Sequence, residues 1–172
     1  MHILTLERPI FRDFALVLLA SFVICLSGQI SIPLWFTPVP IATQNSVVLL
    51  MAALLGARRG TAATFLFLSQ GALGLPVFSN GAAGISCFFG PTGGYLIGYL
   101  LASYLTGTLV DKRKSPITAL ALGNLTIYLF GSTYLSTFIG FPKALLLGVA
   151  PFVLGDILKT IGSLKLMGSR RR

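Results

Sequence analysis

The chain has 172 residues, of which 55% are hydrophobic and only 10% are charged, and its mean hydropathy is +0.88. Ordinary soluble domains carry about 25% charged residues, so this composition excludes a water-soluble fold and predicts one all-α integral membrane domain over residues 1–172. The net charge of +9 would suggest nucleic-acid binding in a soluble protein, but the positions of the charges indicate a membrane topology instead.

The charged residues are grouped at the borders of long uncharged stretches, which cover residues 14–57, 60–110 and 115–142. A helix needs about 20 apolar residues to cross the hydrocarbon layer of a membrane. The first two stretches are therefore each long enough for two crossings and a turn.

Turn-forming residues divide these stretches into six helices. Prolines within 33–40 separate the first helix from the second, and a segment over 74–94 that is rich in Gly, Pro, Ser and Asn separates the third from the fourth. Pro116 is placed to open the fifth helix. The first helix lacks the A-x-A pattern of a cleaved signal peptide, so we expect it to remain in place. The predicted helices cover residues 11–32, 41–57, 60–73, 93–110, 116–137 and 143–166.

The Lys and Arg residues test this six-helix topology independently. With the N-terminus in the cytoplasm, eleven of them fall on the cytoplasmic side, Lys143 falls outside and Lys159 lies within the sixth helix. This excess agrees with the positive-inside rule, so we expect both termini to be cytoplasmic. The cytoplasmic residues are Arg8, Arg12, Arg58, Arg59, Lys112, Arg113, Lys114, Lys165, Arg170, Arg171 and Arg172.

The predicted outer loops are unusual because they are apolar and aromatic. They comprise residues 31–40 and 74–95, with frequent Gly and Pro. One interpretation is that they pack as a re-entrant cap over the helices. A second, compatible interpretation is that the cap closes over a small ligand, with aromatic walls formed by Trp35, Phe36, Phe78 and Tyr95.

The turn Gly90–Gly94 lies where the fourth helix is predicted to start. Its free backbone N–H groups, including that of Gly93, could receive a carboxylate at the positive end of the helix dipole, although simple helix capping also accounts for the sequence. Gly94, Gly98 and Ala102 follow at four-residue spacing, which favours close helix packing over a binding site.

The sixth predicted helix carries two charges, Asp156 and Lys159, within the membrane. A charge there costs roughly 2.5–3.5 kcal/mol on insertion scales, and a spacing of three residues places both on one helical face. They could form a mutually neutralising pair, but burying such a pair for packing alone is rarely a net gain in stability. We therefore favour a ligand site, to which Gln44, Asn45 and Asn80 could add amide groups.

Other chemistry is largely absent from the sequence. The only histidine is His2, Cys25 and Cys87 lack metal-ligand spacing, and we find no nucleophile–base–acid set, Walker A sequence or hydride-cofactor motif. The sequence therefore predicts that the protein is not an enzyme and holds neither a metal nor a cofactor. Transport against a gradient would need an energy source on another chain.

Several motifs together resemble the BioY family, the biotin-binding S components of energy-coupling-factor transporters. They cover nearly the whole chain in the order found in that family. The motifs are Gln29–Pro33 with Phe36–Ile41, Gly71–Phe78, Gly90–Tyr95 and Pro151–Lys159.

The resemblance implies a six-helix bundle with a biotin pocket near the outer face. It implies ligand contacts for Asp156 and Lys159 of the Gly-Asp-x-x-Lys motif and for Asn80 of the second outer loop. Phe78 and Tyr95 occupy the aromatic positions of the family, and Gln44 follows the proline motif as expected.

The resemblance also implies partners, namely a transmembrane coupling protein and two cytoplasmic ATPases, although some family members are thought to work alone. S components commonly meet the coupling protein through a pair of small residues of the A-x-x-x-A type on the first helix. This sequence has no clean pair of that type, because Ser21 and Cys25 have the spacing but not the usual residues. Two positions depart from the family pattern, since Trp35 and Ala42 stand where Pro and Thr are usual.

We expect a multi-pass protein of the bacterial inner membrane that binds biotin outside and delivers it inward. One alternative is an S component for another vitamin or for a biotin precursor. From other classes, the alternatives are a small membrane enzyme that uses Asp156 as an acid or base, and a structural subunit without a ligand.

Overall fold

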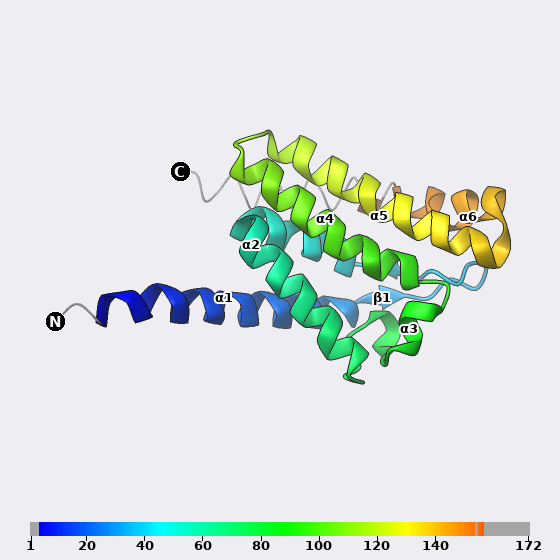
Figure 1. Ribbon diagram of the computed structural model, residues 1–172. Helices are drawn as coiled ribbons and strands as arrows, with labels where there is room; N and C mark the ends of the chain where they lie inside the picture. Colours follow the sequence, from blue (N-terminus) through cyan, green and yellow to red (C-terminus); the bar gives the residue numbers. More distant parts are fainter. Residues whose placement is uncertain (1–3, 154, 157–172) are drawn as a thin grey trace.

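The computed structural model describes residues 4–153 and 155–156, with side chains from residue 10 onward. The fold is almost entirely helical (Figure 1). Lys159 and the predicted sixth helix beyond residue 156 lie outside the described residues. In chain order the elements are α1 (Leu4–Gly28), β1 (Ser31–Ile32), β2 (Ile41–Ala42), α2 (Gln44–Ala72), the 3-10 turn η1 (Ser79–Gly81), α3 (Ser86–Phe89), α4 (Gly93–Asp111), α5 (Pro116–Ile139) and α6 (Phe141–Gly148).

The element α2 consists of two arms that fold back on each other, and these arms correspond to the second and third predicted helices. Gly56 interrupts the helix with φ 78° and ψ 178°. A Cβ atom added to Gly60 would lie 2.5 Å from the Cα atom of Ala52, whereas residues eight positions apart in a straight helix are about 12 Å apart. The bend at Gly56 therefore forms a tight helical hairpin, whose reversal can be followed in Figure 1.

The other boundaries differ from the predictions in ways that the local sequence explains. The first helix ends at Gly28 and not at residue 32, because Ser31 and Ile32 pair with Ala42 and Ile41 in an antiparallel two-stranded ladder. The sixth helix is interrupted, since α6 ends at Gly148 and helical structure resumes at residues 150–153. Pro151, which has no N–H to donate, follows this break.

The central helix α4 packs against both α2 and α5 through small residues, as the four-residue spacing predicts. A Cβ atom on Gly98 would lie 3.2 Å from the Cα atom of Ile127 in α5, and one on Gly107 would lie 2.5 Å from the Cα atom of Ala57 in α2. Ala102 is completely buried. The prediction of close helix packing on this face of α4 is confirmed.

Three of the described helices are long and apolar enough to span a membrane, namely Ile10–Gly28, Gln44–Ala72 and Gly93–Asp111. Large apolar side chains also remain exposed on the outside of the bundle, as Phe14 and Phe22 do on α1 at 61% and 58%. Such a surface suits a lipid environment.

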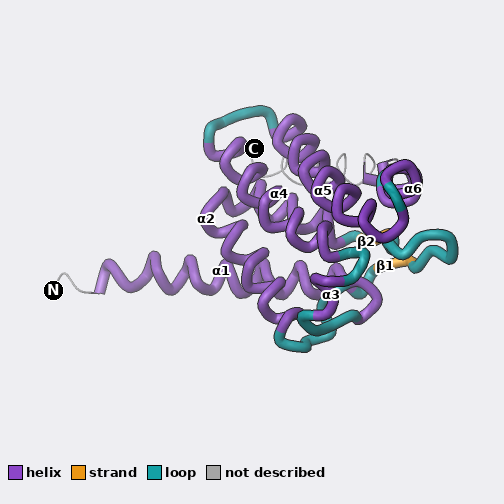
Figure 2. Tube along the Cα trace, turned by 45° about the vertical axis from the view of Figure 1, so that its right-hand side comes forward, coloured by secondary structure: helices purple, strands orange, loops and turns teal. Residues whose placement is uncertain are grey.

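The two ends of the bundle differ in character. The charged segments, which are the α2 bend and the short α4–α5 connection, meet at one end, where the Ala57 N–H donates to Asp111 Oδ2 at 2.9 Å and Arg59 pairs with Asp13 at 2.7 Å. The strands, η1 and α3 lie at the opposite end (Figure 2). The described outer loops there carry no charged residue.

The bend at Gly56 yields a stability prediction. Gly56 has φ 78°, and a Cβ atom there would lie 2.5 Å from Asp111 Oδ1. Gly74 has φ 99° but open space around its would-be Cβ. Both Gly→Ala variants place a side chain on a backbone with positive φ, which costs of order 1–3 kcal/mol, but Gly56→Ala also displaces the carboxylate that caps the second arm of α2. We expect Gly56→Ala to lower the thermal unfolding midpoint in detergent clearly more than Gly74→Ala, and equal shifts would contradict this account of the bend.

Candidate ligand-binding site

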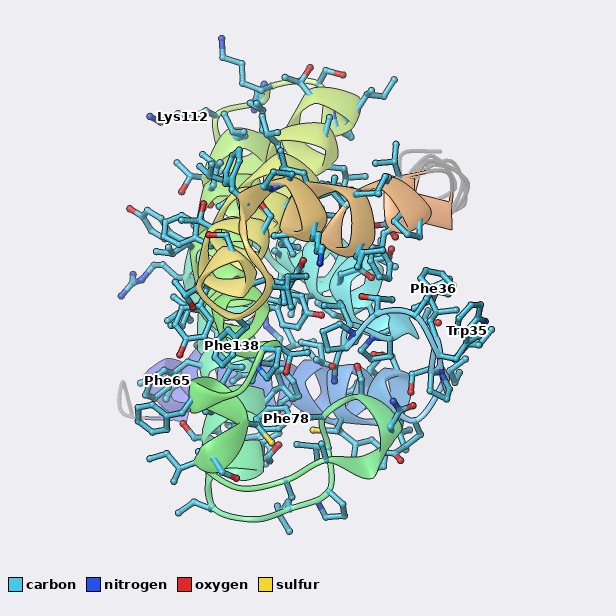
Figure 3. All side chains as sticks on the ribbon, turned by 90° about the vertical axis from the view of Figure 1, so that its right-hand side faces the viewer. Trp35, Phe36, Phe65, Phe78, Lys112 and Phe138 are labelled. Atoms are coloured by element: carbon cyan, nitrogen blue, oxygen red, sulfur yellow. The ribbon has the colours of Figure 1, made fainter. Side chains whose placement is uncertain are left out.

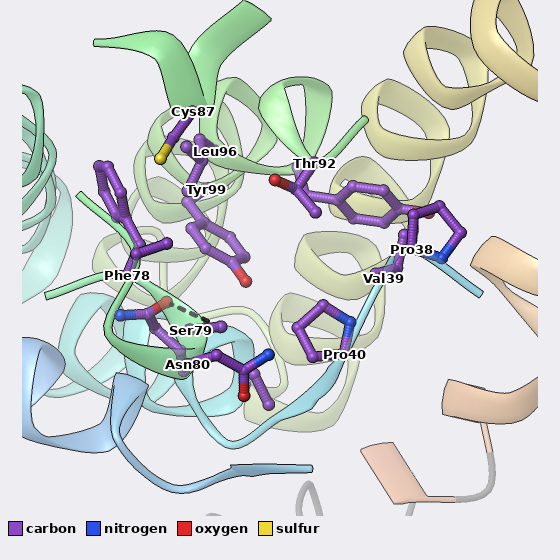
Figure 4. A pocket seen from close by; sticks show the side chains of 14 residues that line it. Pro38, Val39, Pro40, Phe78, Ser79, Asn80, Cys87, Thr92, Leu96 and Tyr99 are labelled. Carbon is purple, nitrogen blue, oxygen red and sulfur yellow. Dashed lines mark hydrogen bonds between the residues drawn. The ribbon is translucent and has the colours of Figure 1, made fainter. Parts of the chain in front are cut away.

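A cavity of about 260 Å³ lies beneath the uncharged loops (Figure 4). This volume is close to the lower end of the roughly 300–1,000 Å³ typical of small-molecule sites. The lining is mainly apolar and aromatic, with a few neutral polar groups. It consists of Pro38, Val39, Pro40, Ala42, Gln44, Phe78, Ser79, Asn80, Ala82, Cys87, Thr92, Tyr95, Leu96 and Tyr99.

The loop over residues 33–40 forms one wall because it is fixed at both ends. The β1–β2 ladder closes its base. Thr37 Oγ1 donates a 3.0 Å hydrogen bond to the carbonyl of Leu147, which ties the loop to α6. Pro38, Val39 and Pro40 are thereby held against the cavity.

Asn80 borders the cavity from the second outer loop. Its backbone has φ 60°, an αL conformation that Asn tolerates better than most residues. Ser31 Oγ donates to Asn80 Oδ1 at 2.8 Å and accepts from the Asn80 N–H at 2.9 Å. The predicted ligand residue is thus held in place by the strand of the first outer loop.

Gln44 lines the cavity as well, but its amide also organises the protein. The side chain is 1% exposed, and Nε2 donates to the carbonyl of Val77 at 2.9 Å. Oε1 accepts from Ser79 Oγ at 3.5 Å. Gln44 therefore joins the start of α2 to the segment that precedes Asn80.

Two of the predicted aromatic residues form the cavity wall. Phe78 is 3% exposed and makes edge-to-face contacts with Phe67 and Phe88, at centroid distances of 5.5 and 5.8 Å. Tyr95 is 7% exposed and donates from its hydroxyl to the carbonyl of Gly148 at 2.8 Å. Both side chains are fixed by contacts outside the cavity, which makes this wall preformed.

The structure does not bring Trp35 and Phe36 to the cavity. Their rings make an edge-to-face contact at 5.4 Å, but Trp35 is 96% exposed and Phe36 is 40% exposed. The two residues stand at the tip of the loop, away from Phe78 (Figure 3). The reason is that the ladder at the loop's base directs residues 38–40 inward and leaves the tip outside.

The backbone of Gly93 lies close to the backbone of Phe88, and Gly93 does not line the cavity. A Cβ atom there would collide with the carbonyl of Phe88, and the Gly93 N–H donates to the carbonyl of Gly90 at 2.9 Å. This N–H is therefore already paired, and the neighbouring Thr92 reaches the cavity instead.

Asp156 is buried in a hydrogen-bond network beside the cavity. Its side chain is 3% exposed, and Oδ2 accepts from Asn45 Nδ2 at 2.6 Å and from the hydroxyl of Tyr128. The three residues come from α2, α5 and the segment after α6. Among the described residues, Asn45 Oδ1 has no hydrogen-bond partner although it is buried.

Asp156 does not line the larger cavity, but its two partners line a second one of about 30 Å³. A space of this size can hold one water molecule. Val39, Pro40, Ala42, Tyr95 and Tyr99 border both cavities. One layer of residues therefore separates the larger cavity from the network around Asp156.

The sequence did not lead us to predict Tyr99 and Tyr128 as residues of the site. Tyr99 follows Tyr95 by four residues, so the two share one face of α4, and this spacing could have identified it. Tyr128 has no comparable signal, because only the tertiary fold brings α5 next to Asp156.

Ser21 and Cys25 face the protein interior. They are 0% and 9% exposed, and each contacts Gln70 Oε1, at 3.1 and 3.2 Å. The outer surface of α1 carries large apolar side chains instead. Ser21 and Cys25 therefore do not form a small-residue pair on the outer surface of α1, where a coupling protein could reach it.

Comparison with known proteins supports the resemblance to the BioY family that the sequence motifs indicate. The chain is 36% identical over 148 residues to a probable biotin transporter BioY of Pyrococcus horikoshii, covering 86% of this chain and 89% of that protein. It is 35% identical over 165 residues to the biotin transporter BioY of Rhizobium etli, covering 87% and 88%.

A solved structure is also similar, the 2.1 Å crystal structure of the S-component for biotin from an ECF-type ABC transporter. The TM-score is 0.86 with 27% sequence identity, and the match covers 95% of this chain and 93% of that one. Residues 3–171 match the BioY family. The chain therefore belongs to the BioY family.

Proposed function

We propose that this protein binds biotin at the outer face of a bacterial inner membrane and delivers it across as the substrate-binding subunit of a vitamin-uptake transporter. Membership of the BioY family supports biotin as the ligand and transport, not catalysis, as the activity. The observation that carries the proposal is the cavity beneath the uncharged loops, with the buried Asp156 carboxylate one layer of residues away.

The chemistry of biotin suits such a site. Its fused rings and alkyl chain are apolar, its ureido group carries two N–H donors and one carbonyl acceptor, and its carboxylate is anionic. We assign the rings to the wall that includes Phe78 and Tyr95, and the ureido group to Asp156, Lys159 and Asn80. The carboxylate then lies near the turn that contains Gly93, and Gln44 supports the wall between them.

The topology belongs to the same proposal. The two arms of α2 together with α1, α4, α5 and the interrupted sixth helix make six spans, with both termini in the cytoplasm. The outer surface of this bundle meets lipid. Because the sequence contains no nucleotide-binding motif, a transmembrane coupling protein and two cytoplasmic ATPases would supply the energy. Biotin is the cargo, and the proposal includes no resident cofactor.

Titration of the purified protein with radiolabelled biotin tests the function and the role of Asp156. We expect saturable binding by the wild type, and a loss of affinity of at least about tenfold in Asp156→Asn, since a hydrogen bond to a charged group contributes roughly 1.5–3 kcal/mol. Asp13→Asn is the matched control, because Asp13 lies at the opposite, charged end.

The outcomes of this titration separate the alternatives. No saturable binding by the wild type would refute the function, whereas wild-type affinity in Asp156→Asn would remove only this residue from the site. Displacement by other vitamins or biotin precursors, in preference to biotin, would identify a different ligand. Addition of the coupling module and ATP to the protein in vesicles then tests delivery.

Cysteine labelling tests where the ligand binds without a substitution that changes the charge of the protein. Cys87 lines the larger cavity, whereas Cys25 is 9% exposed and contacts Gln70. We expect biotin to slow the modification of Cys87 by N-ethylmaleimide and to leave Cys25 largely unmodified in either condition. The measurement is the modified fraction of each peptide by mass spectrometry, with Cys87→Ala as the control for site assignment. Equal Cys87 labelling with and without saturating biotin would show that the ligand binds elsewhere.

A further inference from the structure

Three tyrosines surround the boundary between the two cavities, and their hydroxyl groups have different partners. Tyr95 donates to the carbonyl of Gly148, and Tyr128 donates to Asp156. The hydroxyl of Tyr99 has no hydrogen-bond partner among the described residues. Tyr99 is nevertheless as deeply buried as Tyr95, with each side chain 7% exposed.

The position of Tyr99 explains where its missing partner would lie. The ring projects from α4 into the larger cavity, with its hydroxyl on the side where Ser79, Asn80 and Pro40 stand (Figure 4). A hydroxyl group that lines a cavity can take either a water molecule or a ligand atom as its hydrogen-bond partner. The cavity is the place from which Tyr99 can obtain one.

We propose that the Tyr99 hydroxyl donates a hydrogen bond to a neutral carbonyl oxygen of the bound ligand and thereby helps to select a cyclic urea. This inference rests on the proposed function, in which the ligand is biotin. Tyr99 would contact the ureido oxygen of biotin, and the ureido ring would lie at the boundary between the two cavities, on the side of Asp156.

The surroundings of Tyr99 favour this end of the ligand over the carboxylate. Tyr99 also borders the small cavity that Asn45 and Tyr128 line, and these two residues bind Asp156. Within the described part of the chain, the lining of the larger cavity contains no Lys or Arg. A ligand carboxylate placed here would bring a second anion to the side of Asp156, whereas a neutral carbonyl would not.

The pair Tyr99→Phe and Tyr95→Phe tests the inference, because each variant removes one hydroxyl from the same face of the same helix. Tyr99→Phe should weaken biotin binding about tenfold and leave the unfolding midpoint of the ligand-free protein unchanged. Tyr95→Phe should lower that midpoint by about 2–4 °C, through loss of the bond to Gly148, and serves as the reference for stability only. Tyr104→Phe, at an exposed tyrosine of the same helix that lines neither cavity, is the control for affinity and should keep it within about threefold. The measurements are biotin titration and thermal unfolding of the full-length protein in detergent.

A biotin analogue identifies the ligand atom. In 2-thiobiotin a sulfur atom, which is a weak acceptor, replaces the ureido oxygen. The affinity ratio between wild type and Tyr99→Phe should therefore fall from about ten to near one with this analogue.

Three results would overturn the inference: unchanged biotin affinity in Tyr99→Phe, the same loss for biotin and 2-thiobiotin, or a midpoint that falls as far as in Tyr95→Phe. The third result would show that the Tyr99 hydroxyl stabilises the fold of the ligand-free protein. Failure of the wild type to bind biotin at all would instead refute the proposed function on which the inference rests.

Discussion

The buried carboxylate of Asp156 is the constraint around which the elements next to the cavity are arranged. An ionised carboxylate in an apolar interior is costly unless donors replace its hydration. Asn45 and Tyr128 supply two of them, from the start of α2 and the middle of α5. The same contacts fix the approach of the chain after α6. Hydrogen bonding thus holds three elements around one point, and that point adjoins the cavity.

The two ends of the molecule are built by different means, and this difference suits a binding protein. At the charged end, backbones approach closely at Gly107, and Asp111 caps the second arm of α2. At the other end, side-chain hydrogen bonds join loops that are far apart in sequence, as Ser31 joins Asn80 and Thr37 joins Leu147. A few exchangeable hydrogen bonds can open more readily than packed backbones, so we infer that a ligand enters at the end built from loops.

The sequence predicted the parts of this fold that depend on local composition. The uncharged stretches and the charges at 58–59 and 111–114 located the helices and the bend near Gly56. The spacing of Gly94, Gly98 and Ala102 indicated the packing face of α4 correctly. The positions of Phe78, Asn80 and Gln44 around a cavity agree with the motifs that the chain shares with its family.

What the sequence could not supply depends on contacts between distant residues. Trp35 and Phe36 belong to an aromatic loop, but only the ladder between Ser31 and Ala42 determines that its tip points away from the cavity. Ser21 and Cys25 have the spacing of a contact motif, and their burial follows from the position of Gln70 on α2. The pairing of Tyr128 with Asp156 likewise joins residues 28 positions apart. Hydropathy and spacing carry no information about such pairs.

A crystal structure of the protein with bound biotin tests the central claim most directly. The account predicts that biotin occupies the cavity beneath residues 38–40, with its ureido ring at the boundary shared with the smaller cavity, on the side of Asp156. Biotin bound outside this cavity, for example in the apolar groove between α4 and α5 near Ile97 and Leu129, would contradict it. So would biotin in the cavity with its carboxylate, and not its ureido group, directed at Asp156.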